Sequence, residues 1–404
     1  MSESKVPEIR FEGFSGEWEE KEFKSITKIN QGLQISISSR YTEKIDNSFF
    51  YITNEFLKEN STVKYYIVNP LETVLCTKND VLMTRTGNTG EVVTNIEGAF
   101  HNNFFKIQFD RKKLNKNYLV YFLKLPKTQA LILRLAGVST IPDLNHTDFY
   151  KIKISYSKLE EQTKIGNYFQ NLDKLIEQKE KKQQKLKQLK KAMLDKMFPK
   201  DGADRPEIRF EGFSGVWEEK KLELLADFSK GQGYSKNDLT KNGTPIILYG
   251  RLYTKYQTVI SEVDTFVVGK NSSIYSKGHE VIVPASGETA EDIARASAVK
   301  VSGTILGGDL NIIYPKDIIN NVFLALTISN GKTQKDLSKK AQGKSVVHVR
   351  NADLKEIDLS YPKLEEQTKI GNYFQKLDKL IDLHQRELEK LKNIKKASLA
   401  KMFV

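Results

Sequence analysis

The residues of this chain that could perform chemistry include two short stretches that resemble the end of a phosphate-binding loop. Gly331–Thr333 and Gly343–Ser345 each carry the glycine, lysine and hydroxyl residue of that motif. The motif also requires a glycine five residues earlier, where this chain has Leu326 and Ser338. Without that glycine the backbone amides cannot form a cradle for phosphates, so both stretches are interpreted as chance matches.

Other catalytic patterns are also incomplete. Gly231 and Gly233 lack the third glycine of a dinucleotide-binding fingerprint. The five histidines have no histidine or cysteine at ligand spacing, so a zinc site is not expected. Asn69-Pro70-Leu71 resembles the Asn-Pro-Pro-aromatic signature of adenine methyltransferases but lacks its second proline and its aromatic residue. The sequence therefore predicts no catalytic, cofactor-binding or metal-binding residues, and any chemistry is expected on partner subunits.

Composition favours a soluble chain with a polyanionic partner. A length of 404 residues suits two or more domains, and 39% hydrophobic with 28% charged residues is ordinary for a globular protein. The net charge of +13 favours binding to nucleic acid, with a merely solubilising surface as the alternative. Cys76 is the only cysteine, and no long apolar run could span a membrane. A cytoplasmic protein is expected.

Two segments of the chain occur twice. Leu159–Gln170 returns letter for letter as Leu364–Gln375, and Pro7–Gly16 returns as Pro206–Gly215. Each copy of the second segment leads to a tryptophan, and its aromatic residues are predicted to pack on a hydrophobic surface. The sequences between these repeats share little with each other. The pattern predicts a duplicated frame that carries two different inserts.

The two inserts follow the same order of expected elements. In the first, a strand at Val81–Thr84 leads into the polar turn Arg85–Gly90, and another strand is expected at Phe104–Phe109. In the second, a strand at Glu280–Pro284 leads into the turn Ala285–Thr289. A later glycine-containing loop, 137–142 or 343–348, is expected in each insert. One fold with two sets of exposed side chains is predicted.

Each repeat of Leu159–Gln170 opens a long segment with apolar residues at three- and four-residue spacing, which is typical of a helix that packs along its length on another helix. A helix over 172–197 would be about 40 Å long. The two helices are expected to pack on each other antiparallel. The residues predicted for helix packing or partner-subunit contact are Leu172, Leu175, Ile176, Leu186, Leu189, Met193, Leu377, Leu380, Ile381, Leu388, Leu391 and Ile394.

These observations predict an α+β fold with a pseudo-twofold internal repeat. Two similar mixed α/β domains are separated by two long helices that form an antiparallel coiled coil. The expected divisions are a lead-in at 1–20, a first insert domain at 21–154, a first helix region at 155–200, a linker and second lead-in at 201–219, a second insert domain at 220–359, and a second helix region at 360–404.

The two lead-ins and the two Leu-Glu-Glu-Gln-Thr-Lys-Ile helix starts, alternating with divergent inserts, resemble the specificity subunit of a type I restriction–modification system. The resemblance covers essentially the whole chain. It implies a non-catalytic subunit whose two target-recognition domains each read one half of a bipartite double-stranded DNA site, in DNA methylation and defence against foreign DNA. The helices would fix the gap between half-sites and dock two methyltransferase subunits. S-adenosylmethionine, ATP and Mg²⁺ are expected on partner subunits, which can include two nuclease-translocase subunits.

Under this resemblance the exposed polar turns are the candidates for DNA contact, because side chains that reach base edges specify sequence. Arg85 could pair with guanine, Asn88 with adenine, and Glu288 could accept a hydrogen bond from cytosine. For each residue, an ordinary solvated turn is the alternative. The complete set is Arg85, Thr86, Asn88, Thr89, Ser139 and Thr140 in the first domain, with Ser286, Glu288, Thr289, Lys344 and Ser345 in the second.

Two other functions stay open from the sequence. One is a nucleic-acid-binding adaptor that recruits no methyltransferase, and the other is an enzyme such as a nuclease with an unrecognised site. Methylation that appears only when a methyltransferase partner is added would favour the specificity subunit. Activity of the isolated chain would favour the enzyme.

Overall fold

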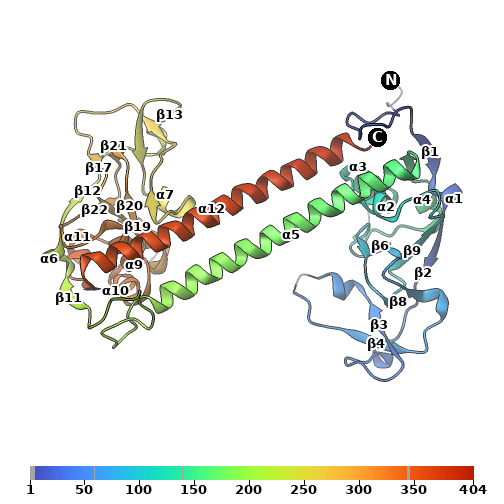
Figure 1. Cartoon of the computed structure of the whole chain (residues 1–404), viewed down its shortest axis with the longest axis horizontal. Helices are drawn as coiled ribbons and strands as arrows, with labels where there is room; N and C mark the ends of the chain where they lie inside the picture. Colours follow the sequence, from blue (N-terminus) through green and yellow to red (C-terminus); the bar gives the residue numbers. More distant parts are fainter. Residues whose placement is uncertain (1–4, 59, 138–139, 344–345) are drawn as a thin grey trace. The chain divides into compact units, whose positions relative to one another are not determined.

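The computed structural model describes residues 5–58, 60–137, 140–343 and 346–404, and the chain divides into two compact units (Figure 1). The first unit comprises Met1–Glu180 with Glu387–Val404, and the second comprises Lys181–Arg386. Helices α5 (Leu159–Lys196) and α12 (Leu364–Lys401) each contribute to both units. Each unit therefore contains the start of one long helix and the end of the other.

In the first unit, two four-stranded sheets and a short two-stranded ribbon carry the insert. The sheet orders are β2-β9-β6-β7 and β4-β3-β8-β5, and β1 pairs antiparallel with β10. The strands are β1 (Glu19–Glu22), β2 (Thr27–Gln31), β3 (Ser48–Ile52), β4 (Tyr65–Val68), β5 (Leu75–Cys76), β6 (Val81–Thr84), β7 (Val92–Thr94), β8 (Gly98–Phe100), β9 (Phe104–Phe109) and β10 (Lys153–Tyr156). The helices before α5 are α1 (Phe23–Ile26), α2 (Lys116–Leu123), α3 (Pro126–Leu135) and α4 (His146–Tyr150), with 3-10 turns η1 (Ile37–Ser39), η2 (Asn54–Leu57) and η3 (Glu72–Val74).

The second unit repeats this plan with five strands in each main sheet. The orders are β12-β22-β18-β20-β15 and β13-β16-β14-β21-β17, with ribbons β11-β24 and β19-β23. The strands are β11 (Glu218–Lys221), β12 (Ala226–Lys230), β13 (Leu239–Thr240), β14 (Thr244–Ile247), β15 (Val259–Ile260), β16 (Phe266–Val267), β17 (Tyr275–Lys277), β18 (Val281–Pro284), β19 (Ser286–Gly287), β20 (Ser297–Val299), β21 (Ser302–Leu306), β22 (Leu310–Pro315), β23 (Val347–His348) and β24 (Asp358–Tyr361). The helices before α12 are α6 (Leu222–Leu225), α7 (Arg251–Thr254), α8 (Ala290–Ile293), α9 (Asn321–Ile328), α10 (Gly331–Lys340) and α11 (Asn351–Lys355), with the 3-10 turn η4 (Lys236–Asp238).

The expected fold class is confirmed: the chain is mixed α+β, with two similar units and two long helices. The predicted strands at Val81–Thr84 and Phe104–Phe109 are β6 and β9. Helix α3 begins at Pro126, where proline occupies the first turn and needs no backbone donor. The long helices begin at Leu159 and Leu364, at the repeated Leu-Glu-Glu-Gln-Thr-Lys-Ile helix starts.

The long helices pair antiparallel in the first unit. The Tyr168 and Ser398 hydroxyls lie 3.1 Å apart, Lys395 lies 2.5 Å from Asp173, and Lys392 lies 2.7 Å from Glu180. As the α5 residue number rises, the number of its α12 partner falls. This is the order that antiparallel packing requires.

The second unit shows the same antiparallel order. Gln183 hydrogen-bonds to Gln385, and Lys190 lies 2.5 Å from Asp378. All of these contacts are polar or charged, so polar side chains as well as apolar ones hold the two long helices together.

Residues that the two repeats share hold each insert on the frame. The side-chain amide of Gln162 donates to the carbonyls of Lys113 and Ser157 at 2.9 and 2.7 Å, and its oxygen accepts from the amide of Asn115. Gln367 makes the equivalent bonds in the second unit. Both glutamines are fully buried, so these bonds satisfy groups that would otherwise be costly to bury.

The Lys-Met-Phe end of each long helix lies in a hydrophobic core. Met402 and Phe403 join the core of the first unit with Trp18 and Phe169. Met197 and Phe198 join the core of the second with Trp217 and Phe374. Trp18 is 2% exposed and Trp217 is 5% exposed, which confirms the prediction that the lead-ins pack on a hydrophobic surface.

Candidate nucleic-acid interface

The polar turn after β6 is tightly bonded. The Arg85 amide donates to the Asn103 carbonyl at 2.7 Å, and the Thr84 hydroxyl donates to the Asn88 carbonyl. Gly87 and Gly90 have φ of +85° and +92°, which favours glycine at both positions. Thr89 is buried, and its hydroxyl donates to the Pro142 carbonyl at 2.7 Å. The turn therefore has one backbone shape and lies against the loop after α3.

Arg85 is committed to partners within the protein. Its guanidinium lies 2.6 Å from the Asp143 carboxylate and 5.7 Å from the centre of the Phe105 ring, and its side chain is only 17% exposed. Asn88 and Thr140 are exposed, and Thr86 is partly buried. The structure thus brings the two predicted segments of this domain together and leaves Asn88 and Thr140 most accessible. Ser139 lies outside the described residues.

The equivalent turn in the second unit is also joined to its later loop. Strand β19 pairs with β23, and the Ser286 hydroxyl lies 3.2 Å from Nδ1 of His348. The Thr289 hydroxyl accepts from the Asp292 amide at 3.0 Å and so caps the N-terminus of α8. Glu288 is exposed. Lys344 and Ser345 lie outside the described residues.

A groove of about 1290 Å³ lies beside this turn. Ser286 and Glu288 line it, together with residues that sequence reasoning missed. The described lining includes Tyr234, Tyr249, Tyr253, Lys236, Arg251, Lys255, Arg295, Asp264, Asp292 and Asp309. The lining holds four basic and four acidic residues.

Most charged groups of the groove are paired. Arg251 lies 2.7 Å from Asp264, which also accepts a hydrogen bond from Lys255. Those two bonds lower the pKa of Asp264 to about 2, so it stays ionised at neutral pH. Arg295 pairs with Asp292 in the same way. These ion pairs engage five of the charged side chains that line the groove, and Glu288 is exposed.

Tyr253 connects the groove to the predicted turn. Its hydroxyl donates to the Ser286 carbonyl at 2.8 Å, and burial raises the pKa of Tyr253 to about 12, so it remains a donor. A Cβ atom at Gly287 would lie 2.8 Å from that hydroxyl, which explains the glycine. Tyr249, 38% exposed, packs edge-to-face on Tyr253. No sequence motif marked helix α7 or the loop before it as part of this groove.

Asp309 is a second missed residue with a detectable signal. Its carbonyl accepts from the Ala285 amide at 2.8 Å, as that of Asn103 accepts from Arg85 in the first unit. Both residues directly precede a core strand, β22 or β9. Aligning the two inserts on those strands would have placed both residues beside the turns.

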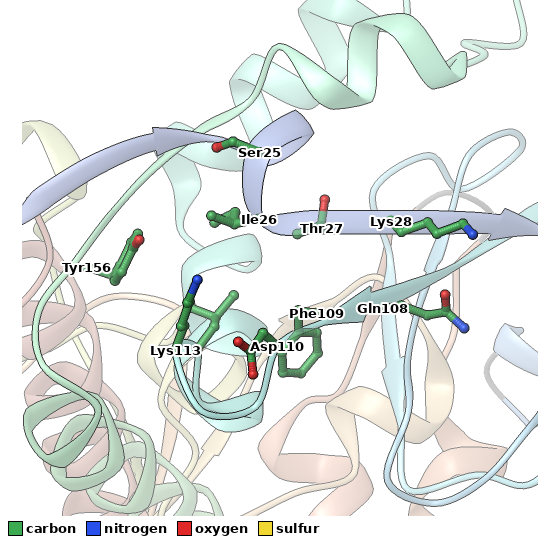
Figure 2. Close-up of a pocket in the computed structure, with 10 residues that line it drawn as sticks. Ser25, Ile26, Thr27, Lys28, Gln108, Phe109, Asp110, Lys113 and Tyr156 are labelled. Carbon is green, nitrogen blue, oxygen red and sulfur yellow. The ribbon is translucent and has the colours of Figure 1, made fainter.

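A smaller cavity of about 350 Å³ lies in the first unit, near the paired ends of β2 and β9 (Figure 2). Lys28, Asp110, Lys113 and Tyr156 are among its lining residues. None of the predicted DNA-contact residues lines it. Among the described residues, no group of histidine, cysteine, aspartate and glutamate side chains could hold a metal ion.

The twelve residues predicted for helix packing or partner contact fall into two groups. Leu172, Leu377 and Leu388 are buried, and Ile176, Leu186, Met193, Ile381 and Leu391 are partly buried. Four others are exposed: Leu175 at 46%, Leu189 at 39%, Leu380 at 37% and Ile394 at 37%. Helical spacing alone could not separate these groups, because both lie at apolar repeat positions.

Two of the four exposed residues lie in each unit. In the first unit, Leu175 and Ile394 lie in the same stretch of the helix pair, between the Lys395–Asp173 and Lys392–Glu180 ion pairs. In the second unit, Leu189 and Leu380 likewise lie between the contacts of Lys190 and Gln183. Leu175 and Leu380 occupy equivalent repeat positions, as do Leu189 and Ile394. We call these the exposed apolar pairs.

The described helices include none with the length and apolar character that crossing a membrane requires.

The duplicated frame, the paired turns and the long helices define a DNA-specificity subunit. The family model for the type I restriction modification DNA specificity domain matches residues 15–188 and again 215–393, and the chain belongs to this family. It is therefore the non-catalytic DNA-recognition subunit of a type I restriction–modification system.

Known relatives agree with this assignment. The chain is 24% identical over 382 residues to the type I restriction enzyme MjaVIII specificity subunit of Methanocaldococcus jannaschii, covering 88% of this chain and 85% of that protein. It is 23% identical over 406 residues to the putative MjaX specificity subunit of the same organism, covering 94% and 91%. The crystal structure of a type I restriction–modification S subunit from M. genitalium has the same fold, with a TM-score of 0.66, 16% identity and 99% coverage of both chains.

Proposed function

We propose that residues 21–154 and 220–359 each read one half of a bipartite double-stranded DNA site. The observation that carries this proposal is the pair of joined turns and loops on an otherwise repeated frame. In the first insert, the turn Arg85–Thr89 contacts the loop Thr140–Asp143. In the second, the turn Ser286–Thr289 pairs with Val347–His348. The two arrangements occupy equivalent places but carry different side chains. Two independently variable surfaces are what an asymmetric split site requires.

The roles of individual residues follow from their partners. Arg85, Thr89 and Thr289 are held by intramolecular bonds and position the turns. Asn88 and Glu288 are exposed and reach base edges, where an amide suits adenine and a carboxylate accepts from the amino group of cytosine. Tyr249 adds an aromatic contact at the groove of the second domain. Lysines around both domains supply phosphate contacts and so affinity without sequence preference.

The long helices hold the two half-sites at a fixed separation and dock two methyltransferase subunits. Two exposed apolar pairs at equivalent repeat positions support this stoichiometry, because solvent-exposed leucines on a helix surface favour burial against a partner. The methyltransferases use S-adenosylmethionine to methylate adenine, and the assembly can also include ATP- and Mg²⁺-dependent nuclease subunits.

A domain exchange tests the proposal. Residues 220–359 are replaced by the corresponding insert of another family member, and the complex with the cognate methyltransferase is assayed on a DNA library. We expect one half-site to change while the other half-site and the gap are retained. A change in both half-sites, or in neither, would contradict separate reading by the two inserts.

A further inference from the structure

We propose that the two lead-in segments act as register clamps for the helix pair and thereby set how strictly the protein discriminates the gap between its half-sites. The first clamp is residues 5–18 and the second is residues 204–217. Arg10 with Glu161 and Arg209 with Glu366 are the positioning residues. The inference rests on the proposed function, because it requires two half-sites read by one chain.

The first clamp holds the start of α5 and the end of α12 through neighbouring residues. Arg10 donates two hydrogen bonds to the Glu161 carboxylate, at 2.8 and 2.7 Å, and a third to the Gly16 carbonyl. Glu161 is 1% exposed. The amide of Ile9 donates to the carbonyl of Lys401, the last residue of α12, at 3.0 Å. One short segment thus fixes both helix ends in the first unit.

The second clamp repeats these bonds in the second unit. Arg209 donates to Glu366 at 2.8 and 2.5 Å, and Glu366 is also 1% exposed. The Ile208 amide donates at 2.9 Å to the carbonyl of Lys196, the last residue of α5. The arginines occupy equivalent positions in an exact repeat, as do the glutamates. Neither clamp includes a predicted DNA-contact residue, so its recurrence reflects the frame and not the half-site.

The seam between the helices needs such a device, because part of its contact is polar. Gln183–Gln385 is a contact between two flexible side chains, and Lys179–Glu387 is a partly exposed ion pair, so each favours one register only weakly. One turn is about 5.4 Å, or between one and two base pairs at about 3.4 Å each. A bidentate arginine fork has a fixed geometry and tolerates no such slip. Slippage would break either the fork to α5 or the Ile9 bond to α12, and loss of the fork would leave a buried carboxylate without its counter-charge.

The test uses the full chain in complex with its methyltransferase and DNA substrates whose gap is varied by one or two base pairs. For Arg10→Met and, separately, Arg209→Met, we expect the preference for the native gap to fall about fivefold or more, while base preference within each half-site is unchanged. Arg10→Lys keeps the charge without the fork and should give an intermediate loss. This milder variant keeps the test decisive if the methionine variant does not fold.

Glu207→Gln provides the matched control, because Glu207 belongs to an exposed ion pair with Lys200 in the second lead-in. It should leave the gap preference unchanged. A folded Arg10 variant that keeps full discrimination of the gap would overturn the inference, and so would equal losses of gap and base preference. If the unaltered complex methylates no split site, the proposed function itself fails, which is a distinct result.

Discussion

The ring of Phe403 stacks on the ring of Tyr118, with centroids 5.1 Å apart and an interplanar angle of 27°. Phe198 stacks in the same way on Phe323 in the second unit, at 5.7 Å and 21°. In each unit, the end of one long helix enters a hydrophobic core. That core includes helix α2 in the first unit and helix α9 in the second. The helix ends are therefore structural parts of the units and not free tails.

This stacking predicts a large loss of stability when the Phe403 ring is removed. Phe403→Ala should lower the free energy of unfolding by about 3–5 kcal/mol, because it empties a buried aromatic site. Thermal unfolding monitored by circular dichroism measures the change. Ile37→Ala, at a 77% exposed position in the same unit, is the control and should have little effect. Equal stability of the Phe403 and Ile37 variants would show that the helix end is dispensable.

Glu288 and Thr289 are neighbours with different predicted roles. Glu288→Ala should change the base preference of the second half-site by about 1–3 kcal/mol, because it removes an exposed acceptor, and should leave stability unchanged. Thr289→Ala should lower stability by about 1 kcal/mol through loss of the α8 cap. Binding to substituted half-sites, measured together with thermal unfolding, separates the two. The account of Glu288 fails if its substitution weakens binding equally to all sequences.

Arg85 and Asp143 should act as one unit. Because their charged groups lie 2.6 Å apart, Arg85→Ala and Asp143→Ala should each weaken recognition of the first half-site, and the double variant should be little worse than either. A double-mutant cycle on DNA binding measures this coupling. Additive effects, with loss of a guanine preference in the Arg85 variant alone, would instead assign Arg85 to direct base contact.

The exposed apolar pairs predict separable docking of two partners. Leu175→Asp with Ile394→Asp should remove one methyltransferase from the complex, because a carboxylate would be buried at the contact. Mass measurement of the assembled complex should then show one copy in place of two. Lys174→Asp, on the same helix but outside the pair, is the control. Retention of two copies in the Leu175 and Ile394 variant would place docking elsewhere.

The frame could be predicted from sequence because its letters are duplicated and its helices are long. The β-prone residues Val81–Thr84 also marked a strand. The pairing of Arg85 with Asp143 could not be predicted, since those residues are far apart in sequence and share no motif. The groove tyrosines were missed for the same reason.

The repeat motif itself was only partly interpretable. Its exact recurrence indicated importance but not that Glu161 binds Arg10 or that Gln162 holds the insert. Likewise, Leu172 and Leu175 both follow the helical apolar pattern, yet one is buried and the other exposed. Burial of a helix position depends on the neighbouring helix, which a single sequence does not specify.

Methylome sequencing by single-molecule detection tests the central claim most directly, in cells that express this chain with its cognate methyltransferase. We predict modified adenines within one split motif, whose two specified parts are separated by a gap of fixed length and no sequence preference. A single continuous motif, or methylation without any sequence preference, would contradict the account of two separate readers on a duplicated frame.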